Sequence, residues 1–207
     1  MFRDAFKKLD LAEIATITDQ INPHLDGSDF DPVETTIMAI PLSFYPGYKL
    51  MDMVDHSTEP HKRRFVLIKD NPQDPDIIIL NWTNEPIYLL NQKAPIQLND
   101  DNICEYVRFF FTYIRGKHGR FIMAENVDDI PWREEPPPQA RKAISKMLKS
   151  LEVLNKKDGN FYLKATMMFR DSLFQADVEV KPNGLVTLSN EELLVEDMPV
   201  LDDTFGQ

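Results

Sequence analysis

The feature that most restricts the fold is a segment that would be apolar around most of a helix. Residues 101–115 read DNICEYVRFFFTYIR. Its apolar residues form a stripe and two flanks at helical spacing: Ile103, Val107, Phe110 and Ile114, then Tyr106, Phe109 and Tyr113, then Cys104 and Phe111. Such a helix is usually buried among several elements. We therefore predict that residues 101–115 form the central helix of the fold.

The segment before this helix is mostly typical of β-structure. Apolar runs predict strands at 35–40, 48–54, 64–68 and 77–80, with proline-containing breaks between them. Glu85-Pro86 ends this pattern before the apolar run at 87–90. Near the start, Asp10 and Glu13 have the spacing of a capping box, and this predicts a helix over 11–21.

The segment after the central helix predicts a short strand at 121–124, a helix and then a β-meander. Pro138 suits the first turn of a helix, and residues 140–151 carry an amphipathic stripe. Strands are expected over 161–170, 174–181 and 185–188, and the middle one alternates clearly between apolar and polar residues.

We therefore predict an α+β fold, in which antiparallel sheets pack around a mostly buried central helix. A C-terminal helix followed by a three-stranded meander completes it. We expect one domain over 1–190, with possible halves 1–130 and 131–190, and then an acidic C-terminal segment, 191–207.

The negative charge is concentrated near the C-terminus. The formal charge is −11, and six acidic residues with no basic residue lie in 190–203: Glu191, Glu192, Glu196, Asp197, Asp202 and Asp203. Without them the charge would be −5. Such acidity disfavours binding to nucleic acid or to an anionic membrane. The 190–203 segment is either a solubilising end or a contact for a basic protein partner.

One segment of this acidic chain is basic: residues 113–121, YIRGKHGRF. A functional interpretation makes Arg115, Lys117 and Arg120 a site for a small anion, with Glu125 as a candidate catalytic base. We prefer a structural interpretation, in which Arg115 complements a helix C-terminus and Gly116 adopts the left-handed conformation that ends helices.

Other candidate sites have simpler explanations. Asp52, Asp55, His56, Glu59 and His61 are of metal-ligating types, but their spacing matches no regular metal motif, so we expect no metal and no cofactor. Cys104 borders the apolar face of the central helix and is interpreted as a small buried hydrophobe. No hydrolase or nucleotide-binding motif is found in the sequence.

Three segments carry a resemblance: IPLSFYPGYKL, EYVRFFFTYIRGKHGRF and LSNEELLVEDMPV. They resemble segments of bacterial proteins of about this length that form an uncharacterised family. The resemblance implies no activity, cofactor or catalytic residue.

The functional prediction is a non-enzymatic protein that binds another protein or a small molecule. The alternative is an enzyme or sensor for a small anionic metabolite that uses the basic turn at 115–120. The first twenty residues have no unbroken apolar region, and no apolar run approaches the roughly 18 residues of a membrane helix, so we expect a soluble cytoplasmic protein. Its oligomeric state does not follow from the sequence.

Overall fold

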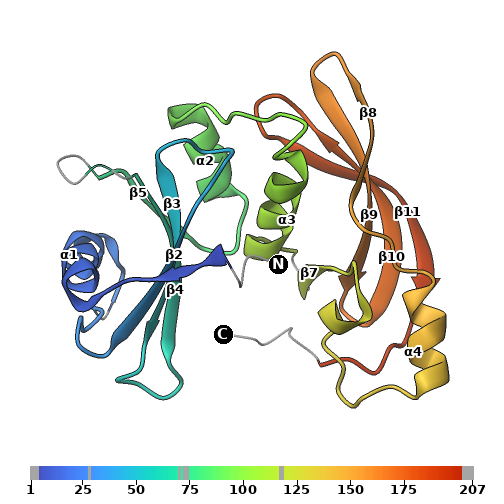
Figure 1. Ribbon diagram of the computed structural model, residues 1–207, viewed down its shortest axis with the longest axis horizontal. Helices are drawn as coiled ribbons and strands as arrows, with labels where there is room; N and C mark the ends of the chain where they lie inside the picture. The colour runs from blue at the N-terminus through green and yellow to red at the C-terminus, as the bar shows by residue number, and fades with distance from the viewer. Residues whose placement is uncertain (1–4, 28, 70, 72–74, 117–118, 202–207) are drawn as a thin grey trace. The chain divides into compact units, whose positions relative to one another are not determined.

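The computed structural model describes residues 5–27, 29–69, 71, 75–116 and 119–201 (Figure 1). The chain forms two compact units that divide after Asn81. The possible division into halves after residue 130 would fall inside the second unit. Helices and antiparallel sheets occur together, so the predicted α+β class is confirmed.

The first unit contains an antiparallel sheet whose strands follow one another in sequence order. The strands are β1 (Lys7–Lys8), β2 (Thr35–Pro41), β3 (Tyr48–Asp55), β4 (Lys62–Lys69) and β5 (Ile77–Leu80). A helix, α1 (Leu11–Ile21), continues into a 3₁₀ turn, η2 (Asn22–His24). The predicted helix and the four predicted strands are therefore confirmed.

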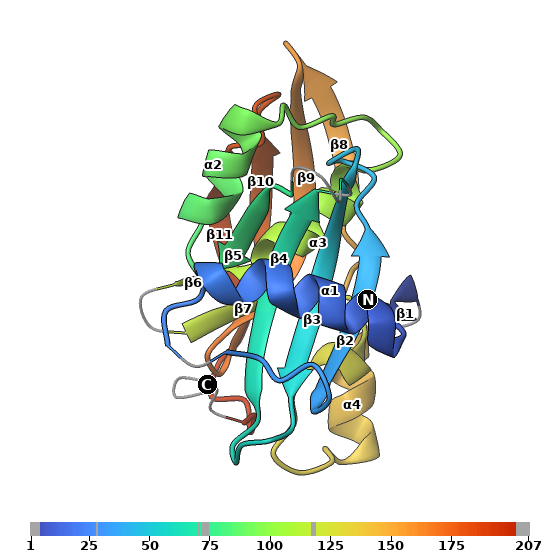
Figure 2. The same ribbon diagram turned by 90° about the vertical axis from the view of Figure 1, so that its left-hand side faces the viewer.

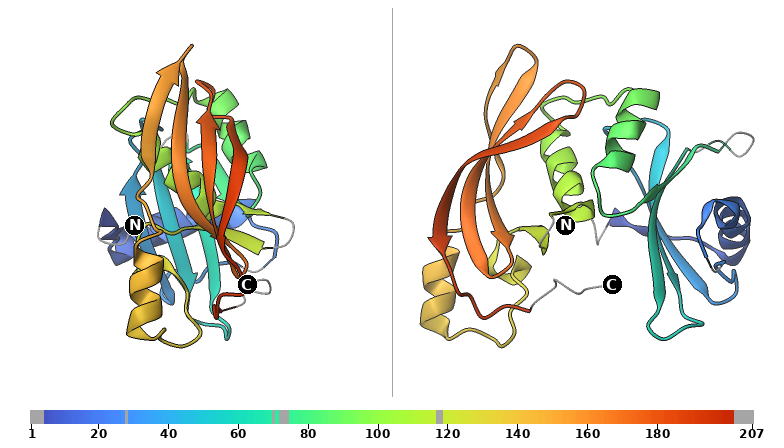
Figure 3. Two further views of the ribbon diagram at one scale, coloured as in Figure 1. Left: turned by 90° about the vertical axis from the view of Figure 1, so that its right-hand side faces the viewer. Right: turned by 180° about the vertical axis from the view of Figure 1, so that it is seen from behind.

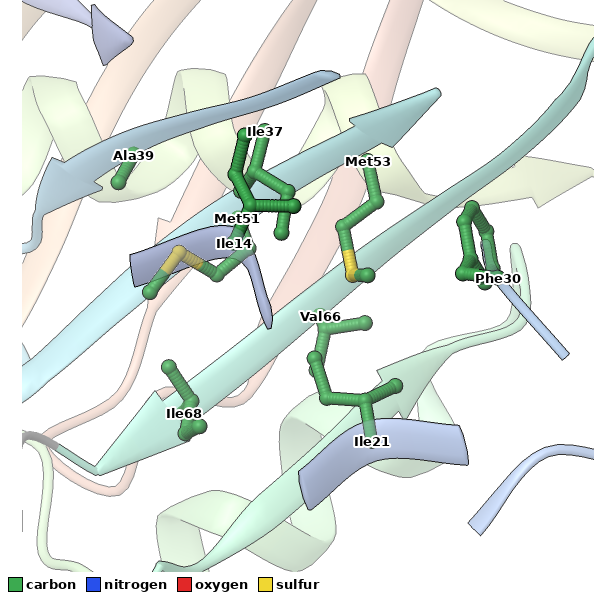
Figure 4. Packing of buried hydrophobic residues seen from close by; sticks show 9 residues of the cluster. All are labelled: Ile14, Ile21, Phe30, Ile37, Ala39, Met51, Met53, Val66 and Ile68. Atoms are coloured by element: carbon green, nitrogen blue, oxygen red, sulfur yellow. The ribbon is translucent and has the colours of Figure 1, made fainter. Parts of the chain in front are cut away.

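Helix α1 begins at the predicted capping box and covers one face of this sheet. The Asp10 carboxylate accepts hydrogen bonds from the backbone N–H groups of Ala12 and Glu13, and the Glu13 carboxylate accepts one from Asp10 N–H at 2.9 Å. The helix crosses the strands (Figure 2). The side chains between helix and sheet form a core of Ile14, Ile21, Phe30, Ile37, Ala39, Met51, Met53, Val66 and Ile68 (Figure 4).

The second unit contains the predicted central helix and a second antiparallel sheet. Its helices are α2 (Glu85–Lys93), α3 (Ile103–Tyr113) and α4 (Pro138–Ser145), with a 3₁₀ turn, η3 (Val127–Asp129). Its strands are β6 (Arg115–Gly116), β7 (Gly119–Met123), β8 (Glu152–Lys157), β9 (Asn160–Phe169), β10 (Ser172–Val180) and β11 (Val186–Val195). The order is β11-β10-β9-β7-β6, and β8 also pairs with β9.

Three segments of this unit differ from the sequence prediction. The apolar run at 87–90 lies in α2, because Pro86 occupies the first turn of a helix instead of separating strands. Helix α4 ends at Ser145, well before residue 151, and β8 follows it. Strand β11 continues to Val195, so the acidic segment begins inside the sheet.

Helix α3 is buried as predicted. Phe109 and Phe110 are 0% and 2% exposed. Phe110 stacks on Tyr88 of α2, and Phe111 makes an edge contact with Phe121 of β7, with ring centroids 5.7 and 5.6 Å apart. Such aromatic pairs add to the free energy gained by burial. The helix is therefore held by α2 and by the sheet of its own unit.

A second apolar cluster of this unit includes residues near α4 and the end of β11. Its members include Ala124, Val127, Ile130, Leu148, Met168, Leu173, Met198 and Val200. Figure 3 shows α4 beside one end of this sheet. The chain after β11 is thereby held by the core, because Met198 and Val200 belong to the cluster.

Candidate functional site

The described residues of the basic segment, 115–116 and 119–120, pair as antiparallel strands in β6 and β7. Arg115 lies directly opposite Arg120, and Gly116 lies opposite Gly119. Directly opposed residues point to the same face of a sheet, with Cβ atoms about 5 Å apart. The structure therefore brings Arg115 and Arg120 together, whereas Lys117 lies outside the described residues.

Arg115 also contacts the first residue of the second unit. Its guanidinium lies over the Trp82 ring, 4.2 Å from the centroid, and its backbone N–H donates to Trp82 O at 2.7 Å. A guanidinium over an indole face is a favourable cation–π arrangement. One role of Arg115 is therefore to hold the connection that enters α2.

The prediction that Gly116 ends the central helix in a left-handed conformation is wrong. Helix α3 ends with Ile114 in an extended conformation, and Gly116 is paired in β6. Among the described glycines of this segment it is Gly119 that has a positive φ, +152°. The helix ends without a left-handed residue because the chain enters the β6–β7 hairpin at once.

Glu125, the candidate base, lies in a hydrogen-bond network that joins three segments of the second unit. Its carboxylate accepts two hydrogen bonds of 2.7 Å from the Arg108 guanidinium on α3. It also accepts the backbone N–H of Leu151, just before β8, at 2.9 Å. Burial opposes ionisation of Glu125, but the bonds from Arg108 and Leu151 outweigh it, so its pKa is lowered. A general base works best with a pKa near the operating pH, so this environment suits an anchor better than a base.

Cys104 lies on the same side of α3 as Arg108 and is half-buried. Its Sγ is 4.0 Å from Leu151 O. Burial raises the pKa of its thiol; the Arg108 charge opposes this effect and the Glu125 charge adds to it, and the net shift is upward. A raised pKa keeps the thiol protonated and makes it a poor nucleophile, in agreement with the interpretation of Cys104 as a small hydrophobe.

A polar surface cavity of about 520 Å³ lies between α4 and residues 125–128, and no local pattern of residues predicted it. Arg141 and Lys142 line it from α4, opposite Asp128 and Glu125. Arg141 forms ion pairs with Asp128 and with Glu135. The charges around the cavity are therefore largely matched by the protein itself.

Two of the acidic side chains at 52–61, Asp52 and Asp55, bind basic side chains of β4. The Asp52 carboxylate accepts two hydrogen bonds from Arg63, at 2.8 and 2.6 Å. Asp55 is buried, 3.4 Å from Lys62 Nζ, and accepts the Ser57 N–H at 2.8 Å. In the part of the chain that the structure describes, no three His, Cys, Asp or Glu side chains gather as a metal site requires.

The acidic segment contributes the edge strand of the second sheet. Glu191 and Glu192 are exposed near the middle of β11. Asn190 has a positive φ of 52° where the pairing with β10 shifts, and its side chain donates to Asp177 Oδ2 at 2.7 Å. Beyond the strand, Met198 N–H donates to Asp171 O and Val200 bridges to Trp132. Residues 190–201 are thus built into the unit, while 202–207 lie outside the described residues.

Comparisons with protein-family models, with curated proteins and with solved structures found no match to this chain. The resemblance to a bacterial family therefore stays a prediction. Over the described residues, no helix has both the length and the apolar character that crossing a membrane requires.

Proposed function

We propose that this is a non-enzymatic cytoplasmic protein that binds a protein partner through its acidic segment. One observation carries the proposal: Glu191 and Glu192 are exposed on β11, at an edge of the sheet. The chain that follows is held by Met198 and Val200, both at most 5% exposed. The carboxylates are therefore presented at a defined place, as an interface requires.

The charge of the segment indicates the chemistry of the partner. Residues 190–203 contain no basic residue, so a surface with lysine or arginine would be attracted and an acidic one repelled. Charges at the rim of an interface act mainly on the association rate and are screened by salt. We expect binding that weakens as the salt concentration rises.

The test is capture of the partner by matched charge variants. Glu191→Gln with Glu192→Gln removes two charges from β11, and Glu152→Gln with Asp158→Asn removes two from the exposed β8–β9 hairpin. We expect a protein captured by the wild type and by the β8–β9 variant, but not by the β11 variant. Equal capture by both variants would contradict the proposal. Point variants suit this test better than truncation, because β11 pairs with β10.

A second candidate function is the binding of a small anion at the basic turn. The observation that favours it is the direct opposition of Arg115 and Arg120 in the β6–β7 hairpin, since two neighbouring guanidinium groups can bind a phosphate or a dicarboxylate. Lys117 would be a further ligand. In this alternative Glu125 is not proposed as the base, because its lowered pKa and its bonds to Arg108 suit an anchoring role.

A further inference from the structure

We infer that β11 binds its partner by accepting an additional β-strand, formed by an extended segment that alternates cationic and apolar residues. This inference rests on the proposed function and specifies how the acidic segment makes its contact. Edge strands carry a row of unpaired backbone groups that can template another strand.

The register of β11 identifies which of its backbone groups point away from the sheet. Val186, opposite Val180, donates its N–H to the Tyr88 hydroxyl at 3.3 Å and so points away from β10. In an antiparallel ladder the outward groups recur at every second residue, so those of Leu188, opposite Val178, also point outward.

The outward-pointing backbone groups of β11 continue beyond the register shift at Asn190. Leu193 lies opposite Phe174, four residues before Val178 on β10 and therefore in the same phase of the ladder. Among the described residues no other strand pairs with this side of β11, so the backbone groups of Leu188 and Leu193 form the central part of its unpaired edge, one before and one after the register shift.

The two faces of β11 define the side chains that an added strand would need. Leu188 and Leu193 share one face with Val178 and Phe174, and Leu193 is 56% exposed. The other face is polar: Ser189 lies opposite Asp177, and Glu192 lies opposite Gln175. A strand beside β11 would therefore place apolar residues on the first face and cationic residues on the second.

The negative charge of β11 favours a cationic strand of another protein over a second copy of this chain as the strand that pairs with its edge. Antiparallel pairing of two β11 strands about their centres would bring Glu191 and Glu192 close to the same residues of the other copy. Like charges that face each other across strands are destabilising, and charged side chains are a known protection of sheet edges. The same carboxylates attract lysine and arginine, so the occupant is a cationic strand of another protein.

The probe is a synthetic ten-residue peptide that alternates lysine and valine, with a block-sequence peptide of the same composition as control. Hydrogen exchange of the full-length protein is followed by NMR. We expect the alternating peptide to slow exchange of the Leu188 and Leu193 amides at least tenfold, and the control peptide to slow it less than threefold. Binding of the alternating peptide without this protection would overturn the inference, because contact through side chains alone leaves these amides open to water.

Leu193 provides a matched pair of variants. Leu193→Pro removes an outward N–H, which an edge strand tolerates, whereas Leu193→Thr shortens the side chain and keeps the N–H. We expect the proline variant to bind the alternating peptide at least tenfold more weakly than the threonine variant, while the β10 amides of both stay protected. Equal affinity of the two variants would overturn the inference, as would a dimer of the protein alone that protects the same amides.

The outcomes separate this inference from the proposed function. If the Glu191 and Glu192 variant loses the partner while Leu193→Pro still captures it, the acidic contact stands and strand addition fails. If both variants capture it as the wild type does, both proposals fail.

Discussion

The contact between Glu125 and Arg108 gives the most quantitative prediction. Glu125→Gln keeps the size of the side chain but removes the charge that accepts hydrogen bonds from Arg108 and from Leu151 N–H. The amide retains one acceptor oxygen and presents an NH₂ group to donors. A half-buried guanidinium on α3 would then lose its counter-ion.

The expected cost follows from the burial of the pair. The side chains of Arg108 and Glu125 are 23% and 15% exposed. Breaking a fully buried pair costs about 3–5 kcal/mol, so the lower end, about 3 kcal/mol, applies to this pair. For a unit of this size that corresponds to a fall in melting temperature of about 10 °C at pH 7.

The pH dependence distinguishes this contact from a simple packing defect. The pKa of Glu125 is lowered in the folded protein from an ordinary value of 4.5. Its contribution to the free energy of unfolding is therefore present above about pH 4.5 and is lost as the pH falls through the folded pKa. We expect the difference between wild type and variant to be full at pH 7 and to shrink toward zero in acid.

Urea denaturation at pH 7, 5 and 3.5 measures this difference, with Glu152→Gln on exposed β8 as the control. The control should change the free energy of unfolding by less than about 0.5 kcal/mol. A Glu125→Gln cost below about 1 kcal/mol at pH 7, or a cost that stays constant down to pH 3.5, would refute the anchoring role.

Two further predictions concern the second unit. A Cβ at Gly184 would lie 2.4 Å from Asn91 Nδ2 and 2.9 Å from the Tyr106 hydroxyl, so Gly184→Ala should cost at least about 2 kcal/mol in urea denaturation. Gly47→Ala, at a similar φ with nothing within 4 Å, should cost about 1 kcal/mol, and equal costs would show that backbone strain alone matters. For the alternative function, pyrophosphate or citrate at a hundred times its dissociation constant should stabilise the wild type by about 2.7 kcal/mol in a thermal-shift assay. Arg120→Gln should abolish that shift, and a shift that survives would place the anion elsewhere.

Local signals predicted much of the secondary structure. The capping box at Asp10 and Glu13 located the start of α1, and the apolar circumference of residues 101–115 predicted the burial of Phe109 and Phe110. The strands expected over 174–181 and 185–188 likewise correspond to β10 and to the start of β11. These features depend on residues within a few positions of one another.

The structural features that the sequence did not predict depend on contacts between residues far apart in the chain. The exposed residues of β8 resemble a loop, and the strand forms because it pairs with β9. The acidic part of β11 lacks strand propensity in the same way, but β10 provides its partner. The bonds from Arg108 and Leu151 to Glu125 join residues 17 and 26 positions apart, and no local pattern marks them.

Both proposals require that the exposed carboxylates of β11 form the contact for a cationic partner. NMR titration of the full-length protein with the alternating lysine–valine peptide tests this contact. We expect the largest chemical-shift changes to fall within residues 187–195 and to weaken as salt is added. Changes that centre on the cavity beside α4, or that spread evenly over the acidic residues of the chain, would contradict it.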